Sequence, residues 1–146
     1  MSDTANIAFD INTTNADAKL GIEIWIDTDC VYQTNHVTTS QHFSHSINDD
    51  DEAEHELRIV MLGKNQQHTV VDDQGNITKD AWITITNPTI DKIEVAQLFN
   101  EKTVYTHDFN GTQPESQHQF YGVMGCNGTV SLRFSTPIYL WLLENM

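Results

Sequence analysis

The chain has 146 residues, a length that fits one domain, and we expect a single domain spanning residues 1–146. Seven Lys and Arg against 21 Asp and Glu give a formal net charge of −14, so the surface repels phosphate backbones and anionic lipid headgroups. This charge argues against nucleic-acid partners and peripheral membrane binding, while the patterned clustering of the apolar residues argues against disorder.

Alternation of apolar and polar residues, the signal of half-buried strands, recurs along the chain. Residues 20–27 place Leu20, Ile22, Ile24 and Ile26 on one face and leave Trp25 on the polar face. Residues 55–61 likewise point Leu57, Ile59 and Met61 inward. In chain order, the predicted strands are 7–12, 20–27, 30–33, 43–47, 55–61, 81–86, 90–95, 103–109, 129–134 and 138–143.

Helical periodicity is nearly absent, and we expect at most one short helical turn, within 95–102. The apolar run 138–143 is interpreted as a buried terminal strand, since a membrane span needs about 20 residues. Turns are predicted at 73–76, 110–111 and 127–128, the last two being Asn-Gly pairs. The fold class is therefore all-β, a two-sheet antiparallel β-sandwich with a jelly roll as the favoured topology.

The first residues lack the basic and apolar regions of a secretory signal, so we expect no signal peptide. Cys30 and Cys126 lie far apart in the sequence and cannot form a disulfide framework, which is typical of a reducing compartment. A single long-range disulfide between them is left open.

An acidic run is the sharpest electrostatic feature of the sequence. Adjacent carboxylates repel one another, and a hard cation such as calcium relieves that repulsion. Asp72 and Asp73 are a second group able to complete an oxygen shell, and a charged, solvated loop is the alternative because the EF-hand spacing is absent. The candidate calcium ligands are Asp49, Asp50, Asp51 and Glu52 of the run, with Asp27 and Asp29.

The histidines and the catalytic motifs give no comparable signal. His42 and His45 are three residues apart on a predicted strand and face opposite sides, which disfavours a shared transition metal. His55 and the other isolated histidines are interpreted as surface or strand-edge imidazoles. Nucleophile elbows, phosphate loops and His-Glu-x-x-His pairs are all missing from the sequence, so we expect no enzyme and no catalytic residues.

Aromatic residues offer a binding hypothesis, because sugar-binding surfaces stack exposed rings against pyranose C–H faces. Trp25 falls on a polar strand face, and Trp82 begins a strand whose inward residues are Ile83 and Ile85. With Tyr121, these two rings are the candidate glycan-binding residues. Rings that cover a sheet edge or fill a subunit interface are the alternative.

Two segments resemble a known family. Gly21-Ile22-Glu23-Ile24-Trp25-Ile26-Asp27 and the stretch 54–64, Glu-His-Glu-Leu-Arg-Ile-Val-Met-Leu-Gly-Lys, are similar to paired strands of jelly-roll carbohydrate-binding modules, particularly the calcium-dependent xylan-binding type. The resemblance extends to residues 83–91. It implies polysaccharide as a partner and calcium as a cofactor.

The C-terminal half carries a second resemblance. Residues 105–112, 120–129 and 136–146 resemble small proteins encoded by tailed phages of marine cyanobacteria. This resemblance implies a non-catalytic structural or decoration protein of the virion, assembled in the host cytoplasm and bound to other virion proteins or to itself. A calcium-dependent carbohydrate-binding module is the alternative function.

Overall fold

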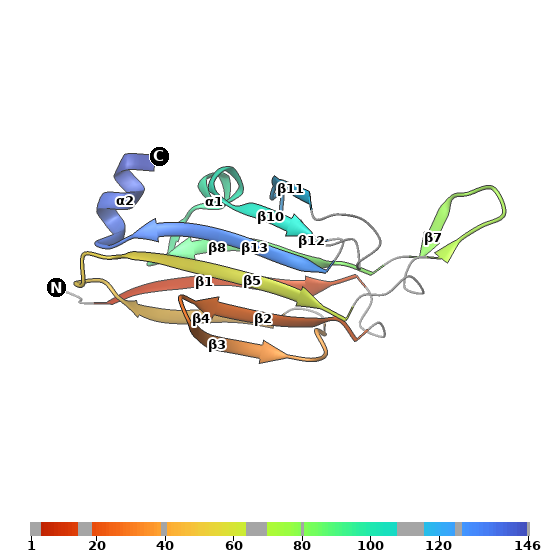
Figure 1. Cartoon of the computed structure of the whole chain (residues 1–146), viewed down its shortest axis with the longest axis horizontal. Helices are drawn as coiled ribbons and strands as arrows, with labels where there is room; N and C mark the ends of the chain where they lie inside the picture. The colour runs from red at the N-terminus through yellow and green to blue at the C-terminus, as the bar shows by residue number, and fades with distance from the viewer. Residues whose placement is uncertain are drawn as a thin grey trace.

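The computed structural model describes residues 4–14, 19–38, 41–63, 70–79, 81–107, 116–124 and 127–145. Within them the chain forms two antiparallel sheets packed face to face (Figure 1), which confirms the predicted sandwich. Sheet A has the strand order β12-β8-β1-β4, with β9 also paired to β8. Its strands are β1 (Thr4–Thr13), β4 (Gln41–Asn48), β8 (Ile83–Ile90), β9 (Ile93–Glu94) and β12 (Val123–Met124).

Sheet B has six strands in the order β11-β10-β13-β5-β2-β3. A separate hairpin, β6 with β7, lies away from both sheets in Figure 1, and its turn at Asp72–Gly75 matches the predicted one. The strands of sheet B and of the hairpin are β2 (Gly21–Ile26), β3 (Asp29–Thr34), β5 (Glu54–Leu62), β6 (Val70–Val71), β7 (Ile77–Lys79), β10 (Val104–His107), β11 (Ser116–Gln119) and β13 (Gly128–Ser135).

The inward faces of the two sheets form one apolar core. Strand alternation produces it, because every second residue of a strand points the same way. Ile22 and Ile24 of β2 are fully buried, and the half-buried Trp25 points outward as predicted. From sheet A, Phe9 and Phe43 pack with their ring centroids 4.8 Å apart.

Helix α1 (Ala96–Lys102) contacts β8 of sheet A and β11 and β13 of sheet B. Its Phe99 packs against Phe9 of sheet A and against Phe120, with ring centroids 6.5 Å and 6.1 Å apart. This helix falls within the short helical segment predicted at 95–102. The predicted strand 90–95 is wrong, because residues Asp91 and Lys92 turn the chain with positive φ angles and leave only the two-residue β9.

The predicted terminal strand 138–143 is also wrong, since these residues form helix α2 (Ile138–Asn145). The helix buries Ile138, Trp141 and Leu142, which recur at the spacing of one helical face. Trp141 packs edge-on against Phe134 of β13 at 6.3 Å. A short apolar run carries no periodicity that separates a strand from a buried helix, and that ambiguity caused the error. No helix in the described part of the chain is long and apolar enough to cross a membrane.

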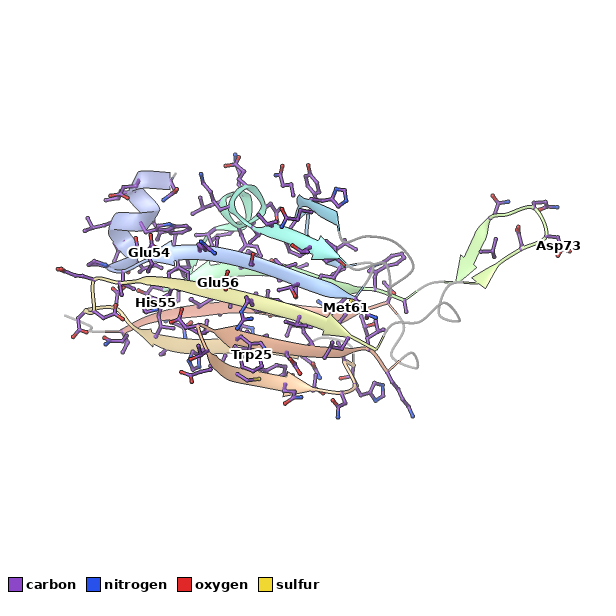
Figure 2. All side chains as sticks on the ribbon, viewed as in Figure 1. Trp25, Glu54, His55, Glu56, Met61 and Asp73 are labelled. Carbon is purple, nitrogen blue, oxygen red and sulfur yellow. The ribbon has the colours of Figure 1, made fainter. Side chains whose placement is uncertain are left out.

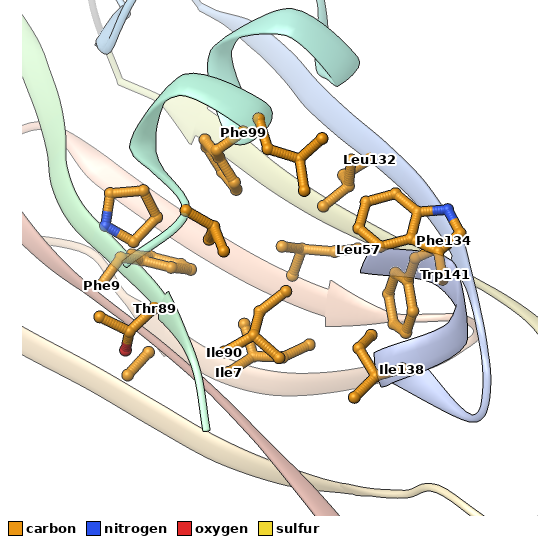
Figure 3. A pocket seen from close by; sticks show the side chains of 14 residues that line it. Ile7, Phe9, Leu57, Thr89, Ile90, Phe99, Leu132, Phe134, Ile138 and Trp141 are labelled. Atoms are coloured by element: carbon orange, nitrogen blue, oxygen red, sulfur yellow. The ribbon is translucent and has the colours of Figure 1, made fainter. Parts of the chain in front are cut away.

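The interior next to both helices is tightly packed. Figure 3 shows the lining side chains, among them Phe9, Leu57 and Phe99, which leave a cavity of about 10 Å³. Such a space holds roughly one water molecule and has an apolar lining. This cavity is therefore too small for a ligand larger than a water molecule.

We expect Trp141→Ala to lower the free energy of unfolding by about 3–5 kcal/mol, because it empties a buried ring site beside Phe134. Leu143→Ala is the matched control in the same helix. Its side chain is 77% exposed, so its cost should stay within about 0.5 kcal/mol. Urea denaturation of both variants checks the difference, and equal costs would show that α2 does not belong to the core.

Candidate functional site

The three predicted glycan-binding rings are divided between the two sheets. Trp25 is on the outer face of sheet B (Figure 2). Trp82 is half-buried just before β8 of sheet A, where its backbone exchanges hydrogen bonds with Thr14 at 3.1 Å and 3.2 Å. Tyr121 lies just before β12, which pairs with β8. Trp25 therefore does not share a site with the other two.

Trp25 is held by polar groups of its own sheet. Its indole Nε1 donates a hydrogen bond to Glu23 Oε1 at 3.1 Å, and Gln33 Nε2 donates to Glu23 Oε2 at 3.3 Å. The guanidinium carbon of Arg58 lies 5.5 Å from the centroid of the ring, which is the distance of a cation–π contact. Glu23 therefore already binds the indole N–H of Trp25, and Arg58 already lies over its ring.

The polar network on sheet B continues through Glu56. Its two carboxylate oxygens lie 3.5 Å from Nε of Arg58 and 3.6 Å from Nε of Arg133. Arg58 also donates a hydrogen bond to the backbone oxygen of Asp27 at 2.9 Å. The network ties β2, β5 and β13 together across the outer face, a structural role that the sequence pattern did not reveal.

Tyr121 differs from Trp25 because its ring is 73% exposed. It lies beside an open groove of about 290 Å³ between β8, α1 and residues 121–123. Thr84 and Thr86 point outward from β8 into this groove, as their alternation with the buried Ile83 and Ile85 requires. The groove therefore combines an exposed aromatic ring with hydroxyl groups.

One end of this groove joins a polar chain across sheet A. Asn87, which has a φ of 54°, donates from Nδ2 to Asp10 Oδ2 at 3.0 Å. The other oxygen of Asp10 lies 2.7 Å from His42 Nδ1. The hydrogen bond from Asn87, together with that from His42, keeps the pKa of Asp10 below its usual value.

The acidic run lies at another end of the sandwich, where it folds against the start of α2. Asp49 Oδ1 accepts a hydrogen bond from the backbone N–H of Ile138 at 2.7 Å, so it serves an otherwise unpaired amide of the first helical turn. Thr136 Oγ1 donates to Asp51 Oδ1. Asp50 and Glu52 are exposed, and Asp29 is exposed on β3.

His55 is clamped between two of the predicted calcium ligands. Its Nδ1 lies 2.6 Å from Asp27 Oδ2, and its Nε2 lies 2.9 Å from Asp51 Oδ2. Figure 2 shows His55 near one end of β5. Its side chain is only 15% exposed and stacks near Phe134, with ring centroids 5.7 Å apart. The interpretation of His55 as a surface imidazole is therefore wrong.

Electrostatics favour a charged form of this cluster. Burial alone would lower the pKa of His55, but the hydrogen bond with Asp27 and the contact with Asp51 outweigh burial and raise it. Burial would raise the pKa of Asp27, yet the bonds from His55 and from the backbone of Glu56 lower it. The bond from Thr136 is the main cause of the lowered pKa of Asp51.

The described carboxylates do not fit a calcium shell. Calcium takes six to eight oxygen ligands, whereas the oxygens of Asp27 and Asp51 already face His55, Thr136 and the backbone N–H of Glu56. Across the described ranges, no group of three or more His, Cys, Asp or Glu side chains is arranged to hold a metal. The calcium assignment stays a prediction that this geometry does not favour.

Two signals could have found what the sequence analysis missed. Extending the inward alternation of Leu57, Ile59 and Met61 back by one step places His55 on the core side. A glycine after Tyr121, with φ of +93°, marks a special backbone position there.

Of the two cysteines, Cys30 is exposed and free, while Cys126 lies outside the described residues. The predicted turn at 110–111 also lies outside the described residues.

The fold is similar to that of vCBM60, a carbohydrate-binding module with solved structures. A solved structure of vCBM60 in its selenomethionine form, described with a circular permutation linking two families of these modules, has a TM-score of 0.55 and 13% identity over 88% of this chain and 89% of that one. A structure of vCBM60 in complex with galactobiose has a TM-score of 0.50 and 13% identity over 87% and 96%. No protein-family model and no curated protein sequence matches this chain.

We expect the contacts of His55 with Asp27 and Asp51 to stabilise the fold most between about pH 4 and about pH 6.5. A raised histidine pKa contributes stability that is complete below the unfolded value near 6.5 and is lost as pH rises through the folded value. The lowered pKa values of Asp27 and Asp51 contribute stability that is lost as pH falls below about 4. The His55→Gln variant should therefore lose less folding stability than the wild type as pH rises above about 6.5.

Urea denaturation of wild type and His55→Gln at about pH 6 and about pH 8 measures this effect. Asp50→Asn is the matched control, because it removes an exposed charge from the same loop without touching His55. The expectation fails if the wild type and His55→Gln lose the same stability between the two pH values.

Proposed function

We propose that this chain is a non-catalytic carbohydrate-binding module. The observation that carries the proposal is the exposed ring of Tyr121 beside a groove lined by hydroxyl and amide side chains. Exposed aromatic rings bind the apolar C–H face of a sugar, and hydroxyl and amide groups bind its hydroxyls. The sandwich fold, shared with modules that bind carbohydrate, supports the proposal.

Calcium does not enter this proposal through the acidic run. The solved relatives are calcium-dependent by description, but here Asp49 caps α2, and Asp27 and Asp51 hold His55. These contacts support a structural role for the acidic loop, in which it secures the C-terminal helix and one end of β5.

A glycan array probed with the purified protein tests the proposal, once in calcium and once in EGTA. We expect specific binding to at least one class of oligosaccharide. A thermal melt of the same samples reports separately whether calcium stabilises the fold. Absence of binding to every glycan in both conditions, with a folded protein, would contradict the proposal.

A virion component that binds other virion proteins or itself is a second proposal. One observation favours it: α2 turns apolar side chains outward, with Leu140 57% and Leu143 77% exposed. Exposed apolar side chains gathered on one helix are a feature of protein interfaces. The solved relatives lend no support to a phage or virion setting, so this proposal ranks behind the first.

The second proposal predicts a concentration-dependent dimer in sedimentation velocity experiments if the partner is a second copy. Leu143→Asp should then shift the dimer toward the monomer, because it places a charge in the apolar contact. Asp50→Asn, away from α2's outward face, is the control. A monomer at every concentration would contradict self-association.

A further inference from the structure

The groove beside Tyr121 is preformed by three local interactions. Phe120 is fully buried and packs edge-on against Phe99 and Tyr105, each at a centroid distance of 6.1 Å. The left-handed backbone of Gly122 then turns the chain, and its oxygen accepts a hydrogen bond from Ile85 N at 2.8 Å. Tyr121 is thereby pointed away from the core.

The Tyr121 ring is also held at its polar end. Its hydroxyl donates a hydrogen bond to Gln119 Oε1 at 3.3 Å. Because this contact holds the ring at its edge, the aromatic face stays available to a ligand. An apolar face of this kind suits the C–H face of a pyranose ring.

The polar side chains that line the groove beside Tyr121 are uncharged. Thr84 and Thr86 contribute hydroxyls, and Asn87 and Asn100 contribute amide groups. The hydroxyls of Thr84 and Thr86 make no side-chain hydrogen bond to another described residue, so they are free to bind sugar hydroxyls. No Asp, Glu, Lys or Arg is among the described residues that line the groove.

From this donor set we propose that the groove between β8, Tyr121 and α1 binds a neutral oligosaccharide, and that it does so without calcium. The inference rests on the proposed carbohydrate-binding function and names its site and ligand class. Acidic glycans are disfavoured because the described lining of the groove offers no cation to pair with a carboxylate, and the chain carries a net charge of −14.

Independence from calcium follows from the groove's chemistry. Calcium sites in proteins are built around carboxylates, which the described lining lacks. Asp10 is the carboxylate that contacts a lining residue, and its two oxygens are occupied by Asn87 and His42. A sugar in this groove must therefore be held by stacking and by neutral hydrogen bonds.

The test measures binding of a panel of neutral oligosaccharides that includes galactobiose, with digalacturonate as the acidic probe, by isothermal titration calorimetry in calcium and in EGTA. Tyr121→Ala is the decisive variant, and its 73% exposure predicts that it folds, which a thermal melt verifies. Tyr139→Ala is the matched control, since it removes another exposed tyrosine, on α2. Trp25→Ala removes the ring on sheet B.

We expect a neutral oligosaccharide to bind equally in calcium and EGTA, and Tyr121→Ala to weaken it at least tenfold while Tyr139→Ala and Trp25→Ala leave it unchanged. Binding that EGTA abolishes, that prefers digalacturonate, or that survives Tyr121→Ala would overturn the inference and leave the carbohydrate-binding function standing. Failure of the wild type to bind any glycan would overturn both.

Discussion

Burial of one face of each sheet against the other is the interaction on which the remaining geometry depends. The long strands of both sheets, among them β1, β2, β5 and β13, each have an apolar side to hide, and residues such as Phe9 and Ile24 belong to the shared core. This requirement forces the intervening residues outward, where they are half-buried or exposed. Both polar networks and the groove beside Tyr121 are consequences of that alternation.

The core of the sandwich is covered by the two helices as well as by the two sheets. Phe99 from α1, with Ile138 and Trp141 from α2, adds apolar volume where strands alone leave the core open. The acidic loop secures the second of these helices through Asp49. Carboxylates in this protein thus have a structural use: they fix a helix and, through His55, one end of β5.

Period-two alternation predicted most strands of both sheets and the outward direction of Trp25, because strand geometry fixes side-chain direction residue by residue. It failed at residues 138–143, where every residue is apolar and no period can be read. It also failed after Ile90, where Asp91 and Lys92 turn the chain with positive φ angles. The alternation of apolar and polar residues carries no information about these angles.

The site was harder to predict than the fold, because partners in a site come from segments far apart in the chain. Alternation places Trp25 and Trp82 outside the main core but says nothing of which sheet carries each. The acidic run suggested a bound cation, whereas the structure places the imidazole of His55 between Asp27 and Asp51. Only the pairing of β2 with β5 brings those groups together.

The adjacency of Phe120 and Tyr121 bears on how this surface meets a ligand. Phe120 is packed in the core while the adjacent Tyr121 is exposed to solvent, so the packing of Phe120 restricts the backbone that carries Tyr121. A rigid contact surface loses little conformational entropy on association, which lets weak stacking and neutral hydrogen bonds suffice. Differences in affinity among ligands would then appear in their dissociation rates more than in their association rates.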